Sequence, residues 1–147
     1  MSKRNITALR DLVQIARDGA DFYAAAEPEV TDARLKTVFE RMAASKQDLI
    51  DALSGRLEMI GETPPSTGTT LGALRKAYTD VRANLTADNE KVYISQLEET
   101  EDRLLHHFED ALRDSDNDEI RSQLQAHLPR VQACHDEMRR LKAKIVA

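Results

Sequence analysis

The residues best suited to chemistry in a protein interior are one imidazole and one carboxylate, which both fall on apolar stripes of predicted helices. His135 recurs with Met138, and Glu101 recurs with Leu104, at the spacing of a helix. Imidazole nitrogens and carboxylate oxygens bind iron, manganese and zinc. A buried carboxylate can instead take a cationic side chain as its partner. These positions therefore predict either a small metal site or a polar cluster in the core.

A lysine falls on a third stripe. Lys46 lies near the centre of the apolar stripe of residues 32–60, and Glu27 ends the stripe of the preceding helix. Lysine can lay its stem along apolar surface, but a buried ammonium group needs a partner. We predict a polar core cluster in which Lys46 supplies the positive charge that a metal ion would bring. Its members are Glu27, Lys46, Glu101 and His135.

The alternative for these residues is structural and ordinary. Lys46 would then reach solvent at the edge of the helices, and Glu101 and His135 would be polar residues of helix interfaces. His127 also faces inward, close before Pro129, and is expected to be a core or capping histidine. The neighbours His106 and His107 are expected to face solvent.

Helices must position all of these side chains, because apolar residues recur every three or four positions through most of the chain. Only 5 glycines and 4 prolines interrupt the 147 residues. Thr31 or Asp32 is a suitable N-cap after Pro28, and the segment 61–70 is rich in proline and glycine, as loops are. The helices are expected over residues 5–27, 32–60, 71–85, 88–113 and 116–146.

This order of helices predicts an all-α domain that spans residues 1–147. The long helices form two hairpins, over residues 5–60 and 88–146, and a crossover loop and helix over 61–87 joins them. Two hairpins with one long crossover make a four-helix bundle. Periodicity alone also allows an irregular five-helix domain.

Several short segments resemble a known family. They are ARDGADFYAAAE at 16–27, FERMA at 39–43, GETPP at 61–65 with Thr67-Gly68, EETED at 98–102, and His135-Asp136. Together they resemble a family of bacterial four-helix-bundle proteins in the ferritin-like superfamily, which is catalogued as a domain of unknown function. The resemblance implies the ferritin-like fold for this bundle, whose crossover carries the extra helix predicted above, but it brings no activity.

The di-iron site of ferritin-like proteins can be compared with the sequence. It takes a Glu from each of two helices and a Glu-x-x-His pair from each of the other two. The first helix offers only Ala16 or Ala20 at its inward middle positions, and Asp18 and Asp21 are expected on its outer faces. The other helices offer Glu40-x-x-Ala43, Glu101 and Gln132-x-x-His135.

One histidine and two carboxylates remain where the family plan requires two and four. Two divalent ions would be left poorly neutralised in a low-dielectric core. We therefore expect no complete di-iron site and no cofactor. The alternative is one iron, manganese or zinc ion on Glu101, His135 and Glu27.

Composition narrows the possible partners. A net charge of −5 and 4% aromatic residues argue against nucleic-acid binding. No apolar run approaches the ~20 residues of a membrane span, and the start of the sequence lacks an apolar signal region. The single cysteine, Cys134, fits a reducing compartment. The expected location is the cytoplasm.

The sequence holds no Ser/His/Asp set, phosphate-binding loop or CxxC pair, and no catalytic residue is predicted. The expected function is that of a non-catalytic structural, stress-associated or interaction protein. Its partner would be another protein or a second copy, and the candidate surfaces are the helix 71–85 and the edge with Ile15 and Phe22. The alternatives are a metal-binding protein or oxidase with a degenerate, mononuclear site, and a binder of lipid or another apolar ligand.

Overall fold

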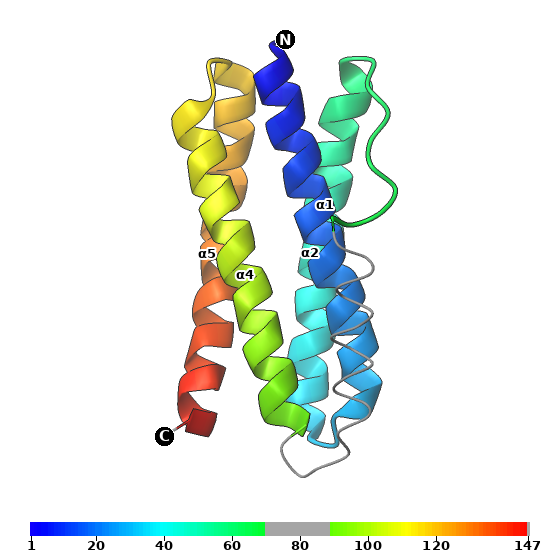
Figure 1. Cartoon of the computed structure of the whole chain (residues 1–147), viewed down its shortest axis with the longest axis vertical. Coiled ribbons are helices and arrows are strands. Elements are labelled where there is room, and N and C mark those ends of the chain that lie inside the picture. The colour runs from blue at the N-terminus through cyan, green and yellow to red at the C-terminus, as the bar shows by residue number, and fades with distance from the viewer. Residues whose placement is uncertain (70–88, 147) are drawn as a thin grey trace.

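Four long helices lie side by side in the computed structural model, which describes residues 1–69 and 89–146 (Figure 1). The chain termini lie at opposite ends of the bundle. The described secondary structure is entirely helical, which confirms the prediction of an all-α, four-helix fold. The predicted helix 71–85 lies outside the described residues. The elements are α1 (Lys3–Ala26), the 3-10 helix η1 (Glu27–Glu29), α2 (Ala33–Met59), α4 (Asn89–Asp114) and α5 (Asp118–Val146).

Local side-chain contacts set the helix ends. Asp32 caps α2 by accepting hydrogen bonds from the amides of Arg34 and Leu35, which confirms one of the two expected caps. At the other end of α2, Gly61 has φ 81°, and the amide of Glu62 bonds back to the Leu57 carbonyl at 2.9 Å. A glycine tolerates this left-handed conformation and so ends the helix sharply.

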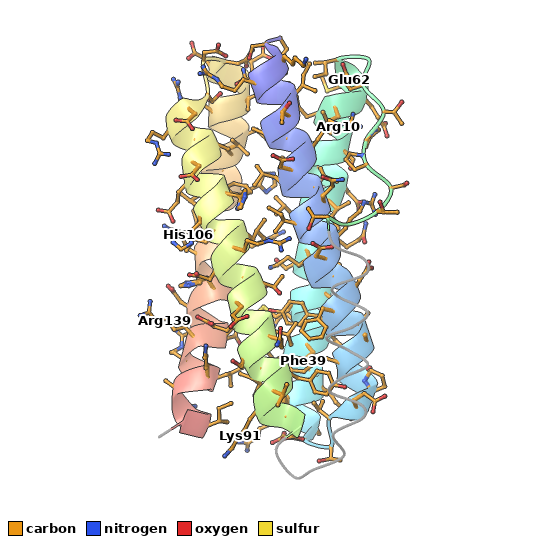
Figure 2. The ribbon with its side chains drawn as sticks, in the orientation of Figure 1. Arg10, Phe39, Glu62, Lys91, His106 and Arg139 are labelled. Carbon is orange, nitrogen blue, oxygen red and sulfur yellow. The ribbon has the colours of Figure 1, made fainter. Side chains whose placement is uncertain are left out.

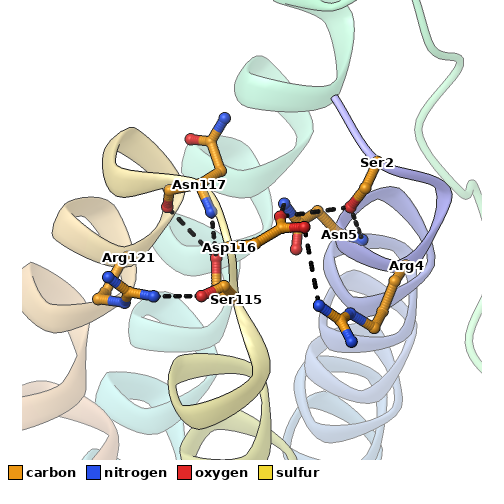
Figure 3. Close-up of polar contacts among 7 residues, drawn as sticks. All are labelled: Ser2, Arg4, Asn5, Ser115, Asp116, Asn117 and Arg121. Carbon is orange, nitrogen blue, oxygen red and sulfur yellow. Dashed lines mark hydrogen bonds and ion pairs between the residues drawn. The ribbon is translucent and has the colours of Figure 1, made fainter.

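The turn between α4 and α5 is tied to the start of α1 (Figure 3). Asn5 donates from Nδ2 to Oδ1 of Asp116 at 2.6 Å, and Arg4 lies 3.7 Å from the other oxygen of that carboxylate. Asn117 caps α5 by accepting from the amide of Ile120 at 3.0 Å. These contacts hold the N-terminal end of α1 against the α4–α5 turn.

The core divides into two apolar clusters, each built from all four helices. The first lies toward the N-terminal half of α1, and the second lies toward η1. Between them, α2 carries Lys46 and α4 carries Glu101, both buried. Figure 2 shows Phe39 of the second cluster between the helices. Large members of the first cluster are Leu12, Leu53, Leu104, Phe108 and Leu124, and of the second Phe22, Phe39, Tyr93, Leu97 and Met138.

The helices pack unevenly. α1 packs most closely on α2, α4 packs on α5, and the two hairpins meet mainly where α1 contacts α4. Ile15 and Phe22, expected at an exposed edge of the first helix, are 2% and 1% exposed. That expectation was wrong because the stripe they form on α1 is packed within the bundle, where Phe22 contacts Tyr93 of α4 at 6.1 Å between ring centres.

No helix in residues 1–69 and 89–146 combines the length and the apolar character needed to cross a membrane.

Candidate functional site

The centre of the bundle holds a buried ion pair. Nζ of Lys46 lies 2.8 Å from Oε1 of Glu101, and the two side chains are 2% and 0% exposed. The hydroxyl of Tyr23 donates to the same oxygen at 2.8 Å. Three helices therefore meet at one carboxylate oxygen, since Tyr23 belongs to α1, Lys46 to α2 and Glu101 to α4. We call these three residues the core triad.

Gly19, one turn before Tyr23, borders the path of the lysine. A Cβ atom placed on Gly19 would lie 3.6 Å from Cγ and Cδ of Lys46 and from Cγ2 of Thr100. The stem of Lys46 thus runs against the backbone of α1 on its way to α4. A Cβ atom at this position would make ordinary van der Waals contacts, and the apolar stem of Lys46 helps fill the space between the helices.

The electrostatics of the core triad favour the neutral form of the Tyr23 phenol. Burial raises the pKa of Tyr23 well above its usual value, and the negative charge of Glu101 raises it further. The other carboxylate oxygen of Glu101, Oε2, is buried and has no hydrogen-bond partner among the described residues. With its residues 0–2% exposed, the core triad is shielded from solvent and resembles a structural contact more than a reaction site.

His135 forms a separate contact at the boundary of α4 and α5. Its Nε2 lies 3.1 Å from Oδ1 of Asp102, and its Nδ1 lies 3.1 Å from Oδ1 of Asp136. Which of the two nitrogens donates depends on the tautomer of the ring. The side chain is 7% exposed, whereas Asp102 and Asp136 are 45% and 61% exposed. Its polar contacts therefore point to the flank of the bundle rather than to Lys46 and Glu101.

Glu27 lies away from the core triad. It belongs to η1 and is half-buried, and its backbone carbonyl accepts a hydrogen bond from Lys36 at 3.4 Å. Of the four residues predicted to form a cluster, the structure joins Lys46 and Glu101 directly. It places His135 on other partners and Glu27 at the helix end. Tyr23 was missed, although a tyrosine on an apolar stripe needs a partner for its hydroxyl.

Asp18 is a second buried carboxylate and corrects an expectation. Its place on an outer face of the first helix was wrong, because the residue is 3% exposed. It follows Ile15 by three positions and precedes Phe22 by four, so it shares their buried stripe. Its Oδ2 accepts from Arg103 of α4 at 2.7 Å and from Thr69 of the 61–69 loop at 2.5 Å. Asp21 is exposed, as expected.

The remaining positions of the di-iron plan do not converge. Glu40 and Gln132 are exposed. Within the two described ranges, no three His, Cys, Asp or Glu residues are grouped so that they could hold a metal ion. At Glu101, the ammonium group of Lys46 occupies the position of a cation. The donor set in the described residues therefore does not fit a di-iron centre.

An open cleft of about 340 Å³ lies between α2 and α5. Two ion pairs cross from one helix to the other beside it, Arg41 to Glu137 at 2.6 Å and Arg130 to Asp48 at 3.4 Å. Cys134 is a buried free thiol at this cleft, with its sulfur 3.6 Å from Oγ of Ser45. The charged groups at the cleft pair with one another across the two helices. Among the described residues, the cleft therefore offers a ligand no charged group that is not already paired.

Residues 4–114 match the model of a protein family described as a domain of unknown function, DUF2383. The match takes in α1, α2 and α4 and ends with the last residue of α4. It includes the whole core triad, whereas His135 lies on α5, beyond the matched residues. No curated protein matches the sequence.

Proposed function

The chain belongs to the DUF2383 family, and we propose that it is a non-catalytic, ferritin-like helical-bundle protein that acts through its surface. In this proposal it serves as a structural, stress-associated or interaction protein of the bacterial cytoplasm. Its partner is another protein or a second copy of the chain. The core triad replaces a metal centre as the polar contact at the middle of the bundle.

One observation carries the proposal: the inward carboxylate of α4 is already neutralised within the chain. Lys46 Nζ lies 2.8 Å from Glu101 Oε1 at a site that solvent does not reach. A metal ion bound to that oxygen would stand beside an ammonium group, and two unscreened cations repel strongly in a low-dielectric core. The lysine thus satisfies the charge of Glu101 and competes with a metal for it.

The order of the helices supports the ferritin-like part of the proposal. α1 with α2 and α4 with α5 form two closely packed hairpins, and residues 60–88 connect them. Bundles of this kind use one long crossover between two hairpins. A net charge of −5 and a single free cysteine agree with a cytoplasmic protein.

Elemental analysis tests the absence of a metal centre. The protein is purified without an affinity tag, incubated with ferrous iron in air, desalted and analysed for iron, manganese and zinc. The expected metal content is far below one ion per chain in the wild type and in Glu101→Gln, His135→Ala and His106→Ala. His106 is exposed, so its variant controls for loss of a surface imidazole.

One observation favours a mononuclear metal site as the alternative function. Oε2 of Glu101 is buried without a partner in the described part of the chain, so this carboxylate retains an unused acceptor. In that case one metal ion per chain is expected, lost in Glu101→Gln and His135→Ala but retained in His106→Ala. This pattern would replace the non-catalytic proposal with that of a small metalloprotein.

Sedimentation tests whether the partner is a second copy. Because Ile15 and Phe22 are buried, self-association must use other surfaces. A mass that rises from monomer toward dimer up to high micromolar concentration would support a homodimer. A monomer over the whole range would leave a different protein as the partner.

A further inference from the structure

The 61–69 loop runs back from the end of α2 toward the middle of α1 (Figure 1). Most of its residues are exposed or half-buried, and Pro65 is its one buried residue. It therefore brings little apolar surface to the bundle. Its attachment must depend on polar contacts instead.

Three arginines and one carboxylate attach the loop. Nη1 of Arg10 donates to the Thr63 carbonyl at 2.9 Å, and Nε of Arg17 donates to the Pro65 carbonyl at 2.8 Å. Nη2 of Arg103 donates to Oγ1 of Thr69 at 2.8 Å. The arginines belong to α1 and α4, so the loop is held by the two helices that join the hairpins.

Asp18 of α1 accepts hydrogen bonds from both the loop and α4. Its Oδ2 accepts from both Thr69 and Arg103, which fixes the end of the loop to α1 and to α4 at once. Its Oδ1 is buried and has no hydrogen-bond partner among the described residues. A carboxylate oxygen in that state has lost its water without a replacement, which disfavours the closed arrangement.

Gly68 closes over this oxygen. A Cβ atom at Gly68 would stand 1.8 Å from Oδ1 of Asp18 and 3.3 Å from the Asp18 amide nitrogen. Only a residue without a side chain can approach the α1 backbone so closely. The glycine thus permits the closed loop, and the same approach keeps water from Oδ1.

We propose that Asp18 is the latch of the 61–69 loop, and that the loop opens as a unit by releasing this carboxylate while the four helices stay packed. Opening breaks the hydrogen bonds to Thr69, Thr63 and Pro65, which water can replace. It also hydrates Oδ1, which has no partner among the described residues in the closed loop. The buried Oδ1 therefore offsets part of the stability of the closed state, and opening exposes Asp18 at the contact of α1 with α4.

Limited proteolysis tests the latch with a matched pair of glycine variants, because the loop is held to α1 and α4 through carbonyls and a hydroxyl rather than through its amides. In Gly68→Ala the added methyl group meets Asp18, and cleavage by proteinase K within residues 62–69 should accelerate on the order of tenfold or more. Cleavage in the middle of α1, α2 and α4 should stay as in the wild type. Gly55→Ala adds the same methyl group where no atom lies within 4 Å, and it should leave the loop unchanged.

A second pair of variants tests the carboxylate without altering the loop backbone. Arg103→Ala removes one donor to Asp18 and should also accelerate cleavage within residues 62–69. Arg113→Ala removes an exposed arginine of α4 that pairs with Asp110 at 2.9 Å, and it should not. Wild-type cleavage rates in the loop of both Gly68→Ala and Arg103→Ala would overturn the proposal. So would equal acceleration in the loop and the helices, because the loop would then not open separately.

Discussion

Glu101 concentrates its interactions on one oxygen. Oε1 receives Lys46 and Tyr23, both at 2.8 Å, while Oε2 is buried without a partner among the described residues. Removing two charges from water has a large free-energy penalty, and a buried pair recovers it only if the geometry is good. The loss of either member should therefore be more damaging than the loss of both.

A double-mutant cycle checks this coupling. Lys46→Met leaves Glu101 buried without its cation and should lower the free energy of unfolding by about 3–5 kcal/mol. The double variant with Glu101→Gln should recover part of that loss, because no uncompensated charge remains. Urea unfolding of the wild type, both single variants and the double variant measures the coupling. Additive effects would show that the two side chains do not interact directly.

Tyr23 predicts a loss of stability at alkaline pH. Its folded pKa is raised, so the unfolded chain releases this proton first as the pH rises above the ordinary value of 10.0. The stability from Tyr23 is complete below that value and is lost as the pH rises toward the folded pKa. Tyr23→Phe should lower the free energy of unfolding by about 1.5–3 kcal/mol at neutral pH, since a hydrogen bond to a charged group is lost.

The difference between wild type and Tyr23→Phe should then shrink above pH 10.0, as measured by urea unfolding over a pH series. A constant difference across the series would show that the folded and unfolded pKa values of Tyr23 are alike.

The inward directions of Lys46 and Glu101 follow from helical periodicity, which fixes the side of a helix on which a residue lies. Periodicity does not fix which neighbour a long side chain reaches. His135 faces inward on its stripe, yet its nitrogens meet Asp102 and Asp136 at the flank. The main apolar stripe of α1 puts Asp18 on an outer face, but the second stripe, to which Asp18 belongs with Ile15 and Phe22, is buried as well.

At the scale of the elements, side chains near the helix ends determine where helices begin and stop. The Asp32 carboxylate accepts from the amides of Arg34 and Leu35 at 2.8 and 3.3 Å, which satisfies two donors that α2 cannot pair internally. Glu27 shows the opposite case, since the following Pro28 ends α1 and leaves Glu27 in a 3-10 turn.

Asp32→Ala should lower the free energy of unfolding by about 1 kcal/mol, because the cap of α2 is lost. Asp32→Asn keeps an acceptor oxygen at the same place and serves as the control, with little change expected. Thermal unfolding of both variants checks this. Equal stability of the alanine and asparagine variants would mean that the cap does not contribute.

At the scale of the whole molecule, the core triad interrupts the apolar packing in the middle of the bundle. Its polar atoms lie between the two apolar clusters, to which all four helices contribute. Buried ion pairs often contribute less to stability than apolar residues of similar size. The division of the core is therefore expected to lower stability rather than raise it.

The triple variant Tyr23→Phe/Lys46→Met/Glu101→Leu tests this expectation by making the core continuous. It removes every polar atom of the core triad at once, so no orphaned group remains. Its free energy of unfolding should equal the wild-type value or exceed it by about 1–4 kcal/mol. A marked loss of stability in urea would show that the core triad is itself a major source of stability.

The ion pair between Arg41 of α2 and Glu137 of α5 predicts a loss of stability in acid. The hydrogen bond from Arg41 lowers the pKa of the Glu137 carboxyl group. The stability from this pair is present above the ordinary pKa of Glu137 and is lost as the pH falls through the lowered folded value. Glu137→Gln should make acid unfolding less steep over that range. Circular dichroism of both proteins over a pH series measures the difference, and parallel curves would contradict the assignment.

The number and order of the described helices could be predicted, because apolar periodicity and the Pro and Gly breaks are local properties of the sequence. The uneven packing could not. Periodicity does not predict that α1 packs closely on α4 while α2 and α5 make few contacts. The contacts between α2 and α5 include ion pairs such as Arg41 with Glu137, and charged residues that pair across helices leave no regular pattern in the sequence. The position of the 61–69 loop depends on Asp18 and Arg103, which lie far apart in the sequence.

The ion pair at mid-height also limits how the helices can slide. Leu97 and Leu104 lie about one turn before and after Glu101 on the same side of α4, and both are buried. A purely apolar contact could tolerate a shift of α4 along the bundle axis by one turn, about 5.4 Å. Here that shift would bring a leucine to Lys46 and leave two separated charges in apolar surroundings. The pair therefore gives the bundle a single axial register.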